Sequence, residues 1–133
     1  MRLRLATLIL VTLWAKDFHA STCVAPKPLK ISGTVCGKVF DVTGALVPNA
    51  ELLLVDDNAA LISRVRADSN ADFAFPLVPE GKYRMDTVAP YRISFGTIQI
   101  TSAKQTRVCK RPVFVYLGVG DCSGGVSRSK PGP

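Results

Sequence analysis

Residues 31–85 read ISGTVCGKVFDVTGALVPNAELLLVDDNAALISRVRADSNADFAFPLVPEGKYRM. Short apolar runs alternate in this stretch with turn residues, at 41–44, 56–58 and 68–71. Strands and turns that follow one another at such short, regular intervals are typical of a small all-β domain. The stretch therefore predicts a compact β module. It contains almost none of the side chains that catalysis requires.

The same alternation continues to residue 119 and predicts about seven strands. We place them at residues 31–40, 50–55, 61–66, 72–75, 83–88, 92–101 and 113–119, with a hairpin turn at 68–71. In the first strand a period of two puts Ile31 and Val39 on one face and Cys36 on the other, less apolar face. Seven short strands suit a two-layer sandwich, and a barrel of similar strand number is the alternative.

The first twenty residues have the layout of a secretory signal peptide, with a basic start, an apolar run at 3–14 and a small residue at Ala20. The apolar run is shorter than the ~20 residues of a membrane span. We expect cleavage after Ala20, while an uncleaved anchor and a lipid-modified Cys23 are the alternatives. Residues 21–30, with two prolines, predict an extended linker. The expected location is secreted or periplasmic, in the cell envelope, with no membrane span in the mature chain.

The positive charge is concentrated near the C-terminus. The chain has a net charge of +7, and residues 104–133 carry six lysines and arginines but one aspartate, whereas residues 21–103 carry eight of each sign. A basic end can contact anionic lipid or nucleic acid, although charges this sparse are more typical of a solvated edge. The aromatic-and-basic pattern of a nucleic-acid module is missing, so we expect no nucleic-acid partner. Residues 120–133, rich in glycine, serine and proline, predict a flexible tail.

Four cysteines, Cys23, Cys36, Cys109 and Cys122, follow the signal segment. An even number behind such a segment predicts disulfides. A zinc site would need close pairs such as C-x-x-C, and the sequence has none. We therefore expect all four cysteines to be oxidised.

Two stretches resemble a known family. GKVFDVTGALVPNAELLL (37–54) resembles the opening of carboxypeptidase regulatory-like domains, and ADSNADFAFPLVPEGKYRM (67–85) resembles the second half of the same motif, with Asp72 where the family usually has glycine. The resemblance covers residues 31–119 and implies a seven-stranded Greek-key sandwich similar to transthyretin. In that fold the first and last strands are neighbours. It therefore implies bridges between the ends of the domain, as Cys36–Cys109 with Cys23–Cys122 or as Cys36–Cys122 with Cys23–Cys109.

Chemical motifs point away from catalysis. The sequence D-S-N-A-D (68–72) begins like a calcium loop, but Phe73 replaces the required glycine and Pro79 the required glutamate, so a plain turn is favoured. The single histidine, His19, lies in the leader, which removes a Ser-His or Cys-His mechanism from the mature chain. We expect no enzyme activity and no metal or other cofactor.

The last predicted strand supplies the candidate binding face. Phe114 and Tyr116 alternate with valines and a leucine, and one of the two faces of this strand must point outward in a two-layer sandwich. We expect a secreted, non-enzymatic β-sandwich module with a structural or protein-interaction role at the cell envelope. The alternative is a carbohydrate-binding module that uses exposed aromatics. The partner, a protein or a glycan of the envelope, is not identified by the sequence.

Overall fold

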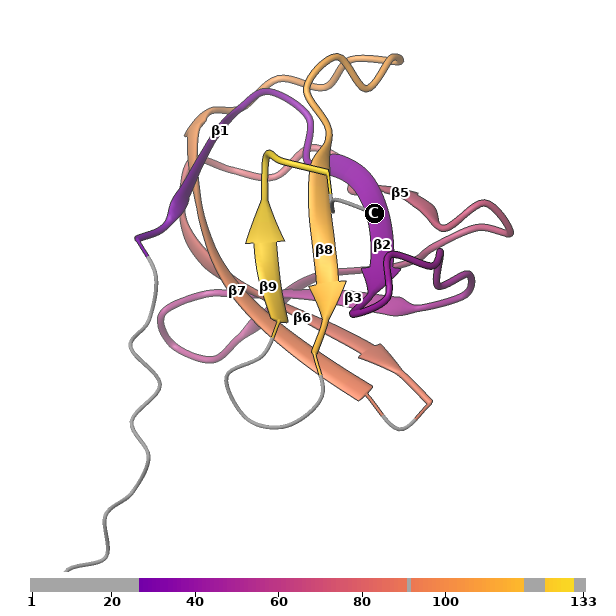
Figure 1. The fold of residues 1–133 in the computed structure, drawn as a ribbon. Helices are drawn as coiled ribbons and strands as arrows, with labels where there is room; N and C mark the ends of the chain where they lie inside the picture. Colours follow the sequence, from indigo (N-terminus) through magenta and orange to yellow (C-terminus); the bar gives the residue numbers. More distant parts are fainter. Residues whose placement is uncertain (1–26, 91, 119–123, 131–133) are drawn as a thin grey trace, which may run out of the picture.

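The computed structural model describes residues 27–90, 92–118 and 124–130, and these residues contain nine strands and no helix. The strands are β1 (Leu29–Ser32), β2 (Cys36–Asp41), β3 (Glu51–Val55), β4 (Leu61–Arg66), β5 (Asp72–Ala74), β6 (Gly81–Ala89), β7 (Arg92–Ser102), β8 (Val113–Leu117) and β9 (Gly124–Ser127) (Figure 1). The prediction of an all-β domain is confirmed, with nine strands in place of seven. In this part of the chain no helix has the length and apolarity to cross a membrane.

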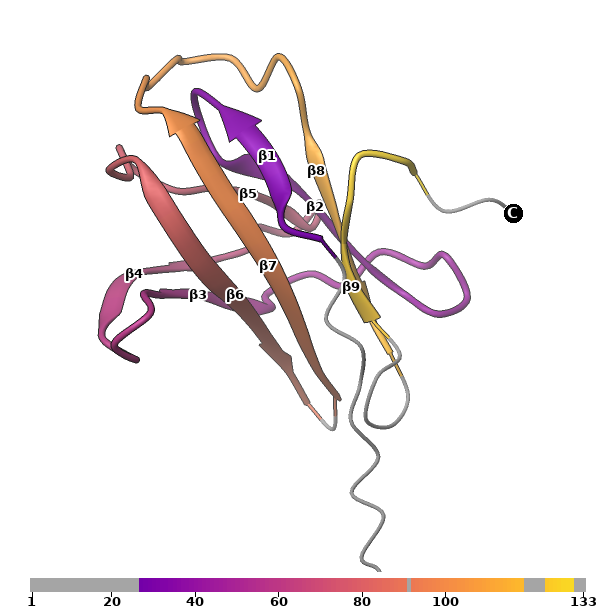
Figure 2. The same ribbon diagram turned by 90° about the vertical axis from the view of Figure 1, so that its left-hand side faces the viewer.

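The strands form two mixed sheets, one of five strands in the order β1-β7-β6-β3-β4 and one of four in the order β5-β2-β8-β9. Figure 2 shows the two sheets as separate layers. The pairs β1–β7 and β2–β8 are parallel, and the other pairs are antiparallel. Both parallel pairs join the N-terminal strands to strands near the C-terminal end of the domain.

The prediction of one continuous strand at 31–40 is wrong. The segment forms two strands, which belong to different sheets. β1 pairs with β7 in the larger sheet, and β2 pairs with β5 and β8 in the smaller one. The break lies at Gly33, which has φ of 94° and donates its N–H to the Ser102 carbonyl at 2.8 Å. Glycine adopts this left-handed region without steric cost, so the chain can change sheets here. β1 also begins at Leu29, inside the segment predicted as a linker.

The predicted turn at 68–71 is present, but it does not form a hairpin. The Asp68 carboxylate accepts hydrogen bonds from the backbone N–H of Asn70 at 2.8 Å and of Asp72 at 3.0 Å. β4 pairs with β3, whereas β5 pairs with β2, so the turn carries the chain from one sheet to the other. The aspartate stabilises the turn through the backbone, as turn chemistry predicts.

The predicted flexible tail at 120–133 contains a strand. β9 pairs antiparallel with β8, with Gly125 opposite Tyr116. A Cβ atom added to Gly96 of β7 would lie 2.7 Å from a methyl group of Val126, so only glycine at 96 allows β9 to approach β7 this closely. A glycine-rich composition favours flexibility in isolation, but here it permits close packing.

The core lies between the sheets and takes side chains from both. Phe73 is 5% exposed, and Phe75 and Tyr83 are also buried, which confirms the prediction for all three. The Tyr83 hydroxyl donates to the Pro79 carbonyl at 2.7 Å, so the ring is buried without leaving its polar group unpaired. The other large residues with the least exposure are Ile31, Val35, Val39, Leu52, Leu54, Met85, Ile98, Val113, Val115 and Leu117.

Truncation of Phe73 tests this core. Phe73→Ala is expected to lower the free energy of unfolding by about 3–5 kcal/mol, because it removes a buried ring and leaves a cavity. Phe95→Ala is the matched control: Phe95 is 58% exposed, so the same change should cost less than about 1 kcal/mol. Urea unfolding measures both. Equal losses in the two variants would contradict the assignment of Phe73 to the core.

Two hydroxyl groups interrupt this apolar interior. Thr87 of β6 and Ser94 of β7 are 0% and 3% exposed and lie opposite each other in the β6–β7 register. Within the described residues, neither side-chain oxygen has a hydrogen-bond partner. A buried polar group without a partner destabilises the folded state. The pair is therefore a local weakness of the core.

Removal of one of these hydroxyls should stabilise the fold. Thr87→Val keeps the shape of the side chain, and we expect a gain of about 1 kcal/mol in the free energy of unfolding. Thr97→Val, at a partly exposed position of β7, should change stability by less than about 0.5 kcal/mol. Thermal and urea unfolding provide the measurement. A loss of stability in Thr87→Val would show that the buried hydroxyl is paired.

Candidate binding groove

The outer face of the four-stranded sheet carries the two aromatic residues singled out by the sequence. Val113, Val115 and Leu117 point into the core, while Phe114 and Tyr116 point outward and are half-buried. Their rings gather around Phe40 of β2, at centroid distances of 5.9 Å for Phe114 and 6.4 Å for Tyr116. Phe114 and Tyr116 therefore lie on the outward face, but as members of a packed cluster.

Tyr116 is engaged at its polar end as well. Its hydroxyl donates to the Ser129 carbonyl, just beyond β9. Burial raises the pKa of this phenol above its usual value, so the hydroxyl keeps the proton that it donates. The interaction holds the segment after β9 against β8. Tyr116 is thus a structural residue more than an open contact surface.

An open groove of about 780 Å³ lies beside this cluster. It is lined by residues of β2, β5 and β8, by the end of β4 and the turn that follows it, and by the loop at 103–112 between β7 and β8. Phe114 is the aromatic residue that the groove shares with the outward face. The lining residues are Thr34, Cys36, Gly37, Lys38, Arg66, Asp68, Asp72, Phe73, Ala74, Thr106, Arg107, Cys109, Pro112, Phe114 and Lys130.

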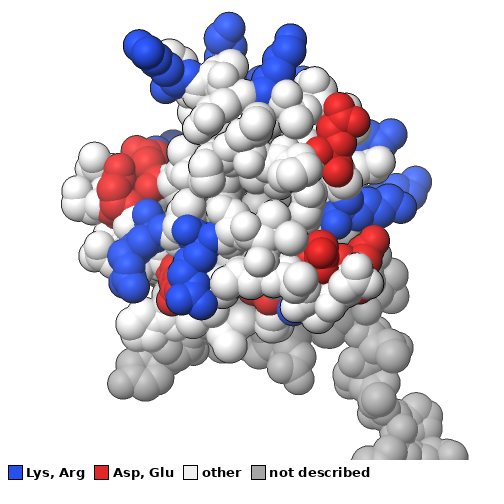
Figure 3. Space-filling model, turned by 180° about the vertical axis from the view of Figure 1, so that it is seen from behind, with Lys and Arg blue, Asp and Glu red and all other residues white. Residues whose placement is uncertain are grey.

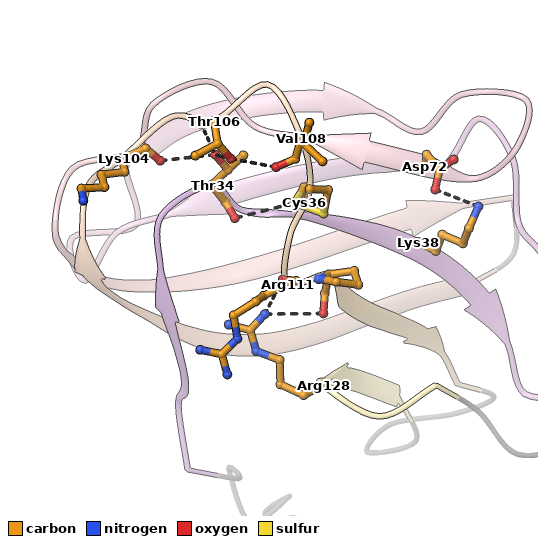
Figure 4. Close-up of a disulfide and its surroundings, with 11 residues drawn as sticks. Thr34, Cys36, Lys38, Asp72, Lys104, Thr106, Val108, Arg111 and Arg128 are labelled. Carbon is orange, nitrogen blue, oxygen red and sulfur yellow. Dashed lines mark hydrogen bonds and ion pairs between the residues drawn. A yellow bond between two sulfur atoms is a disulfide. The ribbon is translucent and has the colours of Figure 1, made fainter.

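A disulfide between Cys36 and Cys109 attaches the loop to β2 (Figure 4). The two cysteines are 73 residues apart, with a Cα–Cα distance of 5.9 Å. This confirms a bridge between the two ends of the domain and selects Cys36–Cys109 over Cys36–Cys122. Cys23 and Cys122 lie outside the described residues, so a second bridge between them remains a prediction.

Hydrogen bonds from Thr34 hold the same loop farther along. Its hydroxyl donates to the Lys104 carbonyl at 3.3 Å and accepts the Thr106 N–H at 2.7 Å. The Thr106 hydroxyl donates in turn to the Val108 carbonyl at 2.8 Å (Figure 4). The loop has no regular secondary structure, yet it is fixed to the segment before β2 by side-chain hydrogen bonds and a covalent bond.

The charges of the groove are partly compensated. Lys38 forms an ion pair with Asp72 at 2.8 Å and donates to the Asn70 carbonyl at 3.1 Å. Arg107 and Lys130 take part in no ion pair within the described residues. Arg66 also lines the groove and forms none in this part of the chain, so the groove contains one ion pair and three cations outside it.

Gly37 is required for the close pairing of β2 with β8. A Cβ atom at this position would lie 1.6 Å from the carbonyl oxygen of Val113, its partner in β8. Any larger residue would push β2 and β8 apart. The sequence pattern counted Gly37 as an ordinary strand position and gave no signal of this close approach.

The groove combines charged, hydroxyl-bearing and apolar side chains. The described residues contain no group of three or more histidine, cysteine, aspartate or glutamate side chains that could hold a metal ion. The hydroxyls of Thr34 and Thr106 are 3.2 Å apart, and each also lies within hydrogen-bond distance of a backbone carbonyl of the loop. Sequence reasoning found Cys36, Cys109 and Phe114, but missed Thr34, Thr106 and Arg107, whose roles depend on how the loop lies.

We compared the chain with known protein families and with curated proteins. No family model matches the chain, and no curated protein shows significant similarity to it. The interpretation of the groove therefore rests on its residues and their geometry.

Removal of the bridge should loosen the loop and the fold together. For the double variant Cys36→Ala/Cys109→Ala we expect a loss of about 4 kcal/mol in the free energy of unfolding, because a bridge that closes a loop of 73 residues restricts the unfolded chain. Amide hydrogen exchange should become faster at 104–111 and stay slow in β6. A loss below about 1 kcal/mol would contradict a structural role.

Peptide mapping without reduction provides the control for that experiment. In the unmodified protein we expect one peptide pair that joins Cys36 to Cys109 and a second that joins Cys23 to Cys122. A peptide that links Cys23 to Cys36 would contradict both assignments.

Proposed function

We propose that this chain is a secreted, non-enzymatic β-sandwich module whose groove binds a protein partner at the cell envelope. The observation that carries the proposal is the groove on the outer face of the smaller sheet, with one lining loop fixed by the Cys36–Cys109 bridge. A bridge of this kind persists in oxidising compartments, which agrees with the signal segment expected at residues 1–20. The resemblance to carboxypeptidase regulatory-like domains is consistent with a module that accompanies other envelope proteins.

The lining of the groove favours a protein over other ligands. Two arginines, Arg66 and Arg107, and the rings of Phe73 and Phe114 line this open depression, and arginine and aromatic residues are enriched in protein–protein interfaces. The loop between β7 and β8 is held before any ligand arrives, because Thr34 and the disulfide fix it. A preformed site lowers the entropy that binding must overcome.

The carbohydrate-binding alternative depends on open aromatic faces. Phe114 and Tyr116 are half-buried around Phe40, which leaves little ring surface for a sugar. The most exposed phenylalanine, Phe95, lies on the outer face of the other sheet, with the Arg84 guanidinium 5.8 Å from its ring centre. A glycan site would therefore be expected there and not in the groove.

Site-specific crosslinking tests the proposal. A photoreactive phenylalanine analogue replaces Ala74, an exposed residue of β5 in the groove, or Lys82, an exposed residue of β6 in the other sheet. After irradiation of the host envelope, position 74 should give an adduct of one discrete mass that position 82 does not give. The same adducts from both positions, or none from position 74, would contradict a protein-binding groove.

A further inference from the structure

The loop at 103–112 carries a concentration of positive charge, and of its four cations only Arg107 also lines the groove. Four cations of the loop and two just after β9 form no ion pair within the described residues. In Figure 3 lysine and arginine side chains project from the top of the molecule, where Figure 1 shows the loop between β7 and β8. We call this set the basic surface: Lys104, Arg107, Lys110, Arg111, Arg128 and Lys130.

Two arginines of the basic surface are held close together by the fold. Arg128 donates to the carbonyls of Arg111, of Pro112 at 3.5 Å and of Lys30 at 3.2 Å. All these acceptors are neutral, and burial together with the charge of Arg111 lowers the pKa of Arg128. Arg128 is thus held against the backbone of Arg111, whose like charge repels it, and within the described residues neither arginine has an ion-pair partner, so an anion would relieve the repulsion.

An apolar side chain lies among these cations. Val108 is 65% exposed, more than any other large hydrophobic residue described, and Arg107 and Lys110 lie on either side of it in the loop. Its carbonyl accepts the Thr106 hydroxyl, so the backbone at this point already has a partner within the loop. The loop exposes the valine to solvent. The disulfide of the next residue, Cys109, to Cys36 holds the loop in place.

We propose that the basic surface docks this protein on an anionic lipid membrane. The cations would contact lipid phosphates, and Val108 would enter the interface between headgroups and acyl chains. Peripheral membrane-binding segments combine basic side chains with exposed apolar ones in this way. The proposal goes beyond protein binding in the groove and does not depend on it, because apart from Arg107 and Lys130 it rests on different side chains.

The exposed side chain of Val108 favours a lipid surface over a soluble polyanion as the ligand. A polyanion in water would pair with the cations but would leave the valine exposed. A membrane accepts both, because its surface is negative and its interior is apolar. The loop is also fixed beforehand, so little conformational freedom is lost on docking.

Vesicle cosedimentation with the full chain tests this inference. The vesicles are phosphatidylcholine with 30% phosphatidylglycerol, and pure phosphatidylcholine vesicles report any binding by the apolar N-terminal residues. Each cation near an anionic surface strengthens binding about fivefold, so the pair Arg107→Gln/Lys110→Gln should bind roughly 25-fold more weakly. The matched pair Arg64→Gln/Lys82→Gln, which removes the same charge elsewhere, should stay within about threefold of the unmodified protein at 0.15 M salt.

A further variant separates the contribution of Val108 insertion from that of electrostatic attraction. Val108→Ser keeps every charge and should weaken binding to the anionic vesicles by about three- to tenfold, because a buried aliphatic group is lost. Thermal unfolding and disulfide mapping confirm that each variant is folded. Equal losses in the two charge pairs, equal binding to neutral and anionic vesicles, or binding to dextran sulfate without binding to vesicles would each overturn the proposal.

Discussion

The bond between Cys36 and Cys109 determines how the surface of this protein is organised. It attaches a long irregular loop to β2, and the loop then lines part of the groove and carries four of the six cations of the basic surface. Hydrogen bonds of Thr34 reinforce the attachment. Without these contacts the same residues would form a solvated connection between two strands, with no defined face toward any partner.

Strands were predicted well where apolar and polar side chains alternate because one face of the strand is buried. The strand at 113–119, observed as Val113–Leu117, and the buried rings of Phe73 and Phe75 follow from that pattern, whereas the strand at 61–66 is present without a buried face. The pattern failed where the chain changes sheets, because alternation reports which side of a strand is buried and not which sheet the strand joins. Gly33 and the turn after β4 are the two examples, and β9 is a third case in which local composition was overridden by packing against β7.

The candidate site was predictable only in part. The even number of cysteines pointed to Cys36 and Cys109, and the alternation of side chains along the last strand pointed to Phe114. Both signals can be read from the sequence alone. The alternative of a solvated basic edge was favoured because six cations over thirty residues look sparse along the chain. In three dimensions, β9 brings Arg128 beside Arg111, and the loop gathers the others. Charge density on a surface depends on contacts between distant segments, which a linear reading does not contain.

The two parallel pairings have a consequence for the order of events in biogenesis. β1 and β2 are made first, yet their partners β7 and β8 are made near the end of the chain. Contacts between segments so distant in sequence form slowly and only once both are present. Until β7 and β8 have been synthesised, β1 therefore lacks its partner, and β2 can pair only with β5. Cys36 can meet Cys109 only after nearly the whole domain has been synthesised.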